Sequence, residues 1–177
     1  MTDLRILIAG FGGQGIQFAG KLLAYVGMYT GHEVSLIPSY GPEMRGGTSN
    51  CSVNISQNPI ASPLVVEPNH LITMNLPSLD KFESTSLPNA TVYIDSTLIE
   101  RKGVRDDLNY VYIPATNMAN ENELRNLANV IICGRFLKDT GICGIDEVDP
   151  IIKKLVPAKR SELYGLNMKA LSLGYRF

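Results

Sequence analysis

Residues 4–15 read LRILIAGFGGQG, an apolar run that opens into a cluster of glycines. The next segment, from Ile16 to Val26, carries apolar residues at helical spacing. The order of strand, glycine-rich turn and helix brings several backbone N–H groups and a helix N-terminus to one point. Such a point attracts a phosphate or another anionic group. We therefore expect an α/β fold whose first loop is a candidate anion site.

The glycines of this turn match the dinucleotide-binding fingerprint G-x-G-x-x-G at Gly10, Gly12 and Gly15. That fingerprint also needs an acidic residue roughly 20 positions later, at the end of the second strand, to bind the ribose. The second predicted strand instead runs into residues 39–42 (SYGP), and Glu33 lies at its other end. The pattern therefore argues against a nicotinamide cofactor. The competing interpretation is a tight turn that needs glycine for positive φ and for close packing.

The composition fits a single globular domain over residues 1–177, because 45% of the residues are hydrophobic. The formal net charge is −1, which gives no support for binding to nucleic acid or to an anionic membrane surface. No apolar run approaches the roughly 18 residues of a membrane span, and Gly10 interrupts the one at the N-terminus. We expect a cytoplasmic protein.

The three cysteines, Cys51, Cys133 and Cys143, are widely spaced and include no C-x-x-C pair. We therefore expect no disulfide framework, iron–sulfur cluster or other metal site within this chain, and interpret the cysteines as small buried hydrophobic residues. His32 and His70 are not spaced as a metal-binding pair, and we expect structural roles for both. The sequence contains no recognisable catalytic triad or dyad.

Strands and helices alternate along the chain. Asn75, Thr116 and Asp146 are the predicted starts of three helices. Nearly continuous apolar strands predict a sheet covered on both faces, whereas residues 51–66 read as a separate hairpin. The predicted fold is a three-layer α/β/α domain with a mainly parallel sheet and an added β-hairpin. Strands are predicted at residues 4–9, 33–38, 51–56, 64–66, 70–74, 91–95 and 110–113, and helices at 15–27, 76–84, 117–127, 128–138, 146–155 and 161–173.

A second unusual stretch, residues 39–50 (SYGPEMRGGTSN), follows the second predicted strand. In an open α/β sheet, loops at this edge form a ligand crevice. The Arg45 guanidinium is suited to two-point binding of a carboxylate or phosphate, and Gly46 and Gly47 allow a partner to approach closely. A salt bridge from Arg45 to Glu43 that holds the loop is the alternative, and the sequence leaves both open.

Together, the motifs at residues 10–15 and 39–48 resemble, in order and spacing, those of the gamma subunit of the 2-oxoacid:ferredoxin (acceptor) oxidoreductases. Later segments are similar to this family as well, so the resemblance covers nearly the whole chain: residues 62–63, 68–72, Asn75, 93–96, 129–134 and 140–141. Residues 44–48 (MRGGT) are more similar to 2-oxoglutarate-type gamma subunits than to pyruvate-type ones.

This resemblance implies a role in an enzyme that oxidatively decarboxylates a 2-oxoacid, transfers the acyl group to coenzyme A and passes two electrons to ferredoxin or flavodoxin. It implies a gamma subunit without catalytic residues that supports conversion of 2-oxoglutarate to succinyl-CoA. Thiamine diphosphate, magnesium and iron–sulfur clusters are expected in the alpha, beta and, where present, delta partner subunits. The isolated chain is expected to bind no cofactor, to be inactive and to be able to form a homodimer.

The candidate binding residues lie in the two loops, where they either contact coenzyme A phosphates or form a subunit interface: Gly12, Gly13, Gln14, Gly15, Tyr40, Arg45, Gly46 and Gly47. Two alternatives for the function stay open. One is a subunit of an indolepyruvate- or pyruvate-type oxidoreductase, and the other is a stand-alone Rossmann-type nucleotide-binding oxidoreductase.

Overall fold

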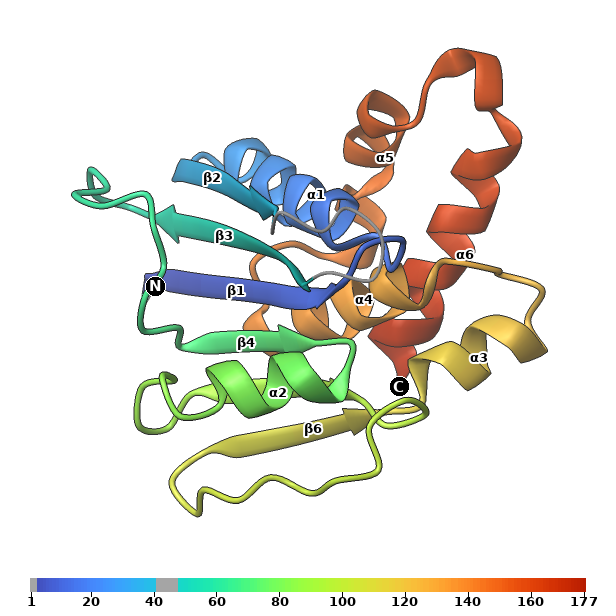
Figure 1. Cartoon of the computed structure of the whole chain (residues 1–177). Helices are drawn as coiled ribbons and strands as arrows, with labels where there is room; N and C mark the ends of the chain where they lie inside the picture. The colour runs from blue at the N-terminus through green and yellow to red at the C-terminus, as the bar shows by residue number, and fades with distance from the viewer. Residues whose placement is uncertain (1–2, 41–47) are drawn as a thin grey trace.

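A computed structural model describes residues 3–40 and 48–177 of the chain. Its centre is a six-stranded sheet with the order β2-β3-β1-β4-β5-β6 (Figure 1). The strands and α-helices are β1 (Leu4–Phe11), α1 (Ile16–Tyr29), β2 (Glu33–Tyr40), β3 (Thr48–Ser56), β4 (His70–Thr73), α2 (Leu76–Phe82), β5 (Thr91–Asp95), β6 (Asn109–Ile113), α3 (Ala115–Glu121), α4 (Ala128–Thr140), α5 (Asp149–Leu155) and α6 (Glu162–Arg176).

The sheet is mixed, with one strand opposed to the others. β1, β4, β5 and β6 pair in parallel, whereas β3 is antiparallel to both β1 and β2. Since β3 lies between β1 and β2, those two strands run in the same direction. The carboxyl ends of β1, β2, β4, β5 and β6 therefore share one edge of the sheet, which we call the carboxyl edge. This arrangement confirms the predicted fold class.

The antiparallel hairpin has a different partner from the one predicted. β3 pairs with β2 along its whole length, while residues 64–66 form no strand. Residues 57–67, which we call the strap, instead cross the back of β3 as irregular backbone. Two prolines in the strap, Pro59 and Pro63, lack the N–H group that a sheet ladder needs, and this explains why the strap cannot pair as a strand.

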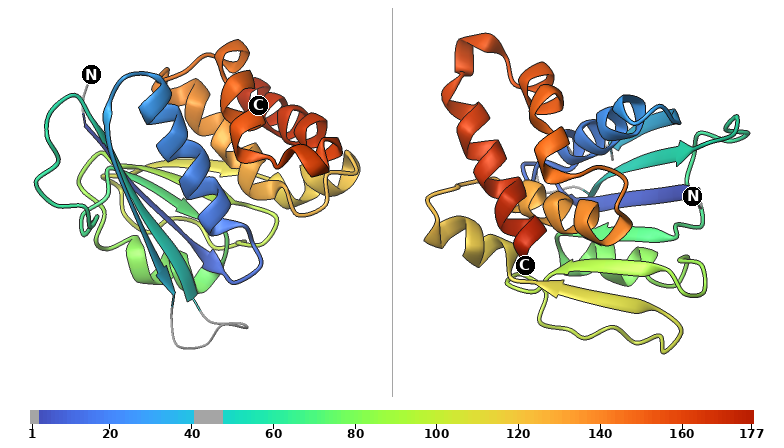
Figure 2. Two further views of the ribbon diagram at one scale, coloured as in Figure 1. Left: turned by 90° about the horizontal axis from the view of Figure 1, so that it is seen from above. Right: turned by 180° about the vertical axis from the view of Figure 1, so that it is seen from behind.

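Helices α1, α4, α5 and α6 form the layer on one face of the sheet, which we call the front face; it is turned away from the viewer in Figure 1 and toward the viewer in the right-hand view of Figure 2. Alternate residues of β1, including Ile6 and Ile8, pack into this layer and are fully buried. The helices α4 and α6 cross so closely that a Cβ atom at Gly174 would lie 1.7 Å from the carbonyl oxygen of Ile131. Among residues 3–40 and 48–177, no helix is both long and apolar enough to cross a membrane.

The back face has a thinner cover, made of α2, the strap and residues 97–108. Leu7, Leu71 and Val92 of the sheet pack there against Leu79 of α2 and Ile99. The back of β3 is polar, yet it is buried beneath the strap, because its polar side chains (Ser52, Asn54 and Ser56) take part in hydrogen bonds with residues 58–65. The alternating pattern of β3 therefore marks a covered polar face and not an exposed one.

One of the three predicted helix starts is confirmed. Asn75 caps α2, where its side chain accepts a hydrogen bond of 2.8 Å from the backbone N–H of Ser78. Helix α3 begins at Ala115, so Thr116 lies inside it, and its hydroxyl donates to Asp95 instead of capping. Asp146 falls in a 3-10 turn, and α5 begins at Asp149, because proline is favoured in a first turn and Pro150 follows.

Candidate functional site

The glycine-rich loop between β1 and α1 owes its shape to three glycines. Gly13 and Gly15 have positive φ values of 99° and 73°, which other residues rarely adopt. Gly10 has ordinary backbone geometry but no space, since a Cβ atom there would lie 2.6 Å from the side-chain oxygen of Gln14. Two of the three fingerprint glycines, Gly10 and Gly15, are therefore required by this turn and its packing, and Gly13, which lies outside the fingerprint, is favoured by its backbone conformation.

Gln14 occupies the inside of the loop with its own side chain. Its Oε1 accepts a 2.6 Å hydrogen bond from the backbone N–H of Phe11, and its Nε2 donates to the carbonyl oxygen of Met74 at 2.7 Å. Phe11 ends β1, whereas Met74 directly follows β4, so Gln14 ties together two neighbouring strand ends. Gln14 is thus a structural bridge within the loop, and its side-chain amide is already engaged.

Asn129 of α4 supports the same loop from below, although no sequence pattern places it among the candidate binding residues. Its Nδ2 donates to the carbonyl oxygen of Gly15 at 2.9 Å, and a Cβ atom on Gly15 would lie 2.5 Å from that nitrogen. The only signal in the sequence is a polar residue opening the apolar run of residues 129–132 (NVII). Asn129 and Gln14 together fix the loop from two sides.

The mouth of the loop is open and bears no charged side chain among the described residues that line it. Helix α1 begins at Ile16, and no side chain of the described residues caps it. A hollow of about 390 Å³ lies there, lined by Phe11, Gly12, Gly13, Gly15, Ile16, Gln17, Phe18 and Ser49. Since the described lining holds no carboxylate, it does not offset the partial positive charge that the helix N-terminus directs at the hollow. The arrangement can attract an anionic group or receive a protein surface.

The second motif begins and ends beside this hollow. In the sheet, Tyr40 pairs with Ser49, and Thr48 pairs with Phe11. Gln17 of α1 donates to Ser49 Oγ at 3.1 Å and so joins the two regions. Arg45, Gly46 and Gly47, like the alternative Arg45–Glu43 salt bridge, lie outside the described residues, and Tyr40 is placed here by its backbone alone. The structure thus brings the glycine-rich loop together with both strand ends of the second motif.

A smaller pocket of about 220 Å³ opens on the other side of Gln14. It lies beyond the ends of β1 and β4, where the chain's strand order changes direction, and such switch points are common ligand sites. Thr116 and Asn120 of α3 line it together with Leu98. The fully buried Asp95 positions α3 there by accepting a 2.6 Å hydrogen bond from the Thr116 hydroxyl.

The histidines and cysteines lie away from this edge or are unreactive. Burial lowers the pKa of His70 to about 4, so its ring is neutral at pH 7, and it packs against Tyr93 and Phe136. All three cysteines are free and buried. Burial raises the pKa of Cys51 and Cys143 to about 11 and that of Cys133 to about 12, so their thiols stay protonated.

Comparison with known protein sequences places the chain in a family. The family model described as pyruvate ferredoxin/flavodoxin oxidoreductase matches residues 5–177. The 2-oxoglutarate synthase subunit KorC of Methanocaldococcus jannaschii is 33% identical over 174 residues, which cover 97% of this chain and 91% of the relative. The ketoisovalerate oxidoreductase subunit VorA of Methanothermobacter thermautotrophicus is 34% identical over 97% of this chain, but the chain spans only 36% of that relative's length.

Solved structures agree on the fold. The gamma subunit of a keto/oxoacid ferredoxin oxidoreductase from Geobacter sulfurreducens has a TM-score of 0.83 at 24% identity, covering 99% of this chain and 96% of that one. The 2-oxoglutarate:ferredoxin oxidoreductase of Magnetococcus marinus has a TM-score of 0.88 at 20% identity, with 99% of this chain matching 31% of that one. Because the family model matches residues 5–177 and KorC is 33% identical over nearly its full length, the chain belongs to the pyruvate ferredoxin/flavodoxin oxidoreductase family.

Proposed function

We propose that this chain is the gamma subunit of a cytoplasmic 2-oxoacid:acceptor oxidoreductase complex, and that its 2-oxoacid is 2-oxoglutarate, which yields succinyl-CoA. The observation that carries the proposal is the 33% identity to a 2-oxoglutarate synthase subunit over nearly the full length of both chains. In this role the chain performs no chemistry. Thiamine diphosphate, magnesium and iron–sulfur clusters belong to the alpha, beta and, where present, delta subunits, and ferredoxin or flavodoxin accepts the electrons.

The carboxyl edge is the part of the chain that we assign to the complex. Three large apolar side chains are exposed around the glycine-rich loop: Phe11 at 36%, Leu76 at 39% and Leu98 at 46%. Exposed apolar side chains that surround a glycine-rich, uncharged hollow favour contact with another protein surface. We therefore propose that this edge packs on a catalytic subunit. Without that partner the same edge can pair with a second copy, which gives the expected homodimer.

Coenzyme A fits the same edge by its charge. The N–H groups at the start of α1 favour a pyrophosphate, and we propose that the Arg45 guanidinium adds a second, charged contact. The similar 2-oxoglutarate:ferredoxin oxidoreductase of Magnetococcus marinus has been solved with coenzyme A and succinyl-CoA bound. An incoming phosphate meets no carboxylate among the described residues that line the hollow beside Gly12 and Gly13.

The first test is anaerobic purification of the tagged chain with its partner subunits. We expect a brown complex that oxidises 2-oxoglutarate only when coenzyme A is present, and a colourless, inactive chain when it is produced alone. An isolated chain that turns over a 2-oxoacid or carries a visible cofactor would contradict the proposed role.

A second test separates coenzyme A binding from assembly. In the reconstituted complex, Arg45→Ala is expected to raise the KM for coenzyme A about tenfold, which corresponds to one lost charged contact. Arg176→Ala, a change of an exposed arginine on α6, serves as the matched control. If Arg45→Ala lowers the amount of assembled complex and leaves the KM unchanged, the loop is an interface and the coenzyme A contact is wrong.

A branched-chain 2-oxoacid is the second candidate substrate, because the ketoisovalerate oxidoreductase subunit is 34% identical to this chain. Turnover of ketoisovalerate, indolepyruvate, pyruvate and 2-oxoglutarate by the reconstituted complex distinguishes these substrates. The stand-alone dinucleotide-binding alternative is disfavoured because the second strand runs into residues 39–42 (SYGP) without the acidic residue that would bind the ribose. Saturable NADH binding by the isolated chain would restore that alternative.

A further inference from the structure

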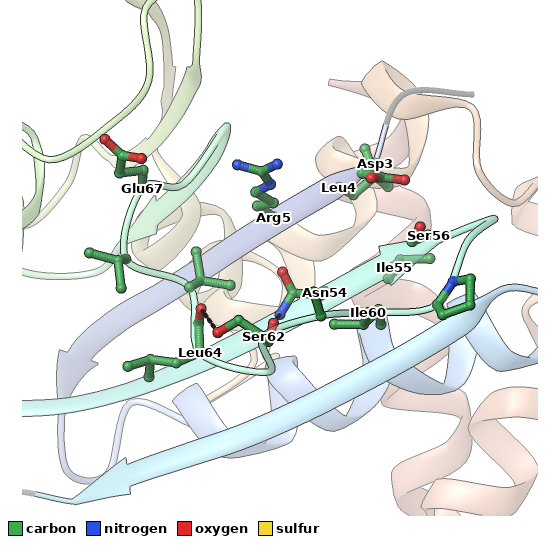
Figure 3. A pocket seen from close by; sticks show the side chains of 14 residues that line it. Asp3, Leu4, Arg5, Asn54, Ile55, Ser56, Ile60, Ser62, Leu64 and Glu67 are labelled. Carbon is green, nitrogen blue, oxygen red and sulfur yellow. Dashed lines mark hydrogen bonds between the residues drawn. The ribbon is translucent and has the colours of Figure 1, made fainter.

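The opposite end of the sheet contains a hollow of about 430 Å³ between the start of β1, the end of β3 and the strap (Figure 3). It lies at the edge opposite the glycine-rich loop, because β1 runs from this hollow to that loop. Its volume is within the range of roughly 300–1,000 Å³ that is typical of small-molecule sites. The proposed function leaves this hollow without a role.

The floor of the hollow is held in a fixed orientation by Asn54 of β3. Its Nδ2 donates to Ser35 Oγ at 2.9 Å and to the carbonyl oxygen of Pro63 at 3.0 Å, so the amide nitrogen is committed to the strap side. Its Oδ1 points toward the hollow in Figure 3 and accepts no hydrogen bond from the residues that the structure describes. Asn54 is only 8% exposed, and its amide therefore offers a preorganised acceptor to a ligand.

Charged groups of both signs lie at the same hollow. Arg5 extends from β1, and Asp3 and Glu67 contribute carboxylates from either side (Figure 3). Within the described part of the chain, the Arg5 guanidinium forms no ion pair, and neither carboxylate does. Arg5 and Glu67 are both exposed, so their charges are available to a ligand that carries an anionic group and a cationic group.

The strap adds an apolar wall to these charges. Leu64 and Val66 are 54% and 65% exposed, and Ile60 lies beside them in the lining. Binding of a small apolar group over these exposed aliphatic side chains is favourable, because it removes apolar surface from water. The lining thus combines one guanidinium, carboxylates, one amide oxygen and a short aliphatic surface.

We propose that this hollow binds a free α-amino acid with an aliphatic side chain. Its carboxylate pairs with the Arg5 guanidinium, for which a two-point hydrogen bond is the favoured geometry. Its ammonium group donates to Asn54 Oδ1, and its side chain covers Leu64 and Val66. Each charged group of the amino acid then has a partner, which a simple carboxylic acid or amine could not achieve.

The purpose that we assign to this site rests on the second candidate of the proposed function, a branched-chain 2-oxoacid, whereas the binding itself does not. An aliphatic amino acid is the aminated counterpart of a branched 2-oxoacid, since the two differ only by exchange of an amino group for a keto group. By binding the amino acid, this subunit can make the activity of the oxidoreductase complex depend on how much of the aminated form of its 2-oxoacid is present.

The test measures binding of L-valine, L-leucine and L-isoleucine to the purified full-length chain by isothermal titration calorimetry. We expect saturable one-to-one binding of at least one of them. Ketoisovalerate and valine amide, each of which lacks one of the two charges, are expected to bind at least about tenfold more weakly, as befits one lost charged contact. No heat of binding at millimolar amino acid, or equal affinity for the two analogues, would overturn the proposal.

Two variants locate the site. Arg5→Met removes the carboxylate partner but keeps the backbone hydrogen bond from Arg5 to Asn69, and it is expected to weaken binding about tenfold. Glu67→Gln is expected to weaken binding less, because Glu67 acts on the ammonium group only through its charge and Asn54 still accepts from that group. Arg176→Met is the matched control, and circular dichroism checks that each variant is folded. Unchanged affinity in Arg5→Met would contradict the assignment. Since no partner subunit is present, this result stands apart from the test of the complex.

Discussion

Two loops of this molecule are each held by one polar side chain, and the two side chains differ in charge. Gln14 holds the glycine-rich loop through an N–H of β1 and a carbonyl oxygen after β4. Glu83, which is 4% exposed, holds residues 101–107 on the back of the sheet. Its carboxylate accepts hydrogen bonds from the backbone N–H of Val104 at 2.9 Å, from Arg101 at 2.8 Å and from the Tyr110 hydroxyl.

The difference shows how each loop is suited to its position. A neutral amide stabilises the glycine-rich loop and leaves the electrostatic attraction of the α1 N-terminus free to act on an incoming anion or partner. A carboxylate surrounded by donors stabilises the back loop more strongly, because hydrogen bonds to a charged group exceed those between neutral groups. The back loop is therefore a structural element, whereas the loop at the carboxyl edge combines a fixed shape with an open surface on which the described lining residues carry no charge.

The largest effect is expected from Glu83→Ala. This change leaves the Val104 N–H, the Arg101 guanidinium and the Tyr110 hydroxyl without their shared acceptor, and a loss of about 3 kcal/mol in the free energy of unfolding follows. Urea denaturation measures it. Asp107→Ala removes an exposed ion pair with Arg105 and should cost far less. Equal losses in the two variants would show that Glu83 is no more than a surface contact.

Acid is expected to weaken the back loop selectively. Burial alone would raise the pKa of Glu83, but hydrogen bonds from Tyr110, Arg101 and Val104 outweigh it and hold this pKa below its ordinary value. A carboxyl group with a lowered pKa in the folded state stabilises the protein above its unfolded-state pKa of about 4.3. That contribution is lost as the pH falls through the folded-state pKa.

The measurement is the free energy of unfolding between about pH 6 and pH 3, compared for the wild type and Glu83→Gln. The difference in the free energy of unfolding between the two proteins, which we call the stability gap, should narrow as the pH falls, since protonation of Glu83 makes the wild type resemble the variant. The gap between the wild type and Gln14→Ala should stay constant, because Gln14 does not titrate. A constant gap for Glu83→Gln would contradict the assigned role of the carboxylate.

Gln14 allows its two roles to be separated. Gln14→Ala removes both hydrogen bonds and is expected to lower the free energy of unfolding by about 1–2 kcal/mol. Gln14→Glu can still accept from Phe11, but its carboxylate faces the carbonyl oxygen of Met74 and adds negative charge beside the hollow. In the reconstituted complex, Gln14→Glu should therefore raise the KM for coenzyme A more than Gln14→Ala does. The reverse order would mean that no anion approaches this edge.

The sequence predicts those features that depend on neighbouring residues and misses those that depend on distant ones. The apolar run at residues 4–9 and the cap at Asn75 are local patterns, and both are confirmed. The predicted partner of β3 is wrong, because alternation along a strand shows which side chains share a face but not which strand lies beside it.

The supports of the loops escape prediction for the same reason. Asn129 lies 114 positions from the Gly15 carbonyl that it contacts, and Glu83 lies 27 positions from Tyr110. Each of these polar residues reads locally as an ordinary helix or loop residue. Only the fold brings them to a loop whose N–H, carbonyl or hydroxyl groups need a partner, as buried polar groups do.

The smallest expected effect comes from a pair of glycines with similar backbone geometry in different places. Gly13 at φ 99° and Gly31 at φ 79° both have open space where a Cβ atom would lie, so alanine at either position costs about 1 kcal/mol of backbone strain. Gly31 lies two positions after the end of α1, at the opposite edge of the sheet, whereas Gly13 lines the hollow at the carboxyl edge. Thermal unfolding should therefore show similar losses of stability for Gly13→Ala and Gly31→Ala.

Only Gly13→Ala should also reduce assembly with the partner subunits in a co-purification experiment, because its methyl group stands where the partner is proposed to pack. Equal assembly of both variants would place the subunit contact elsewhere on the chain.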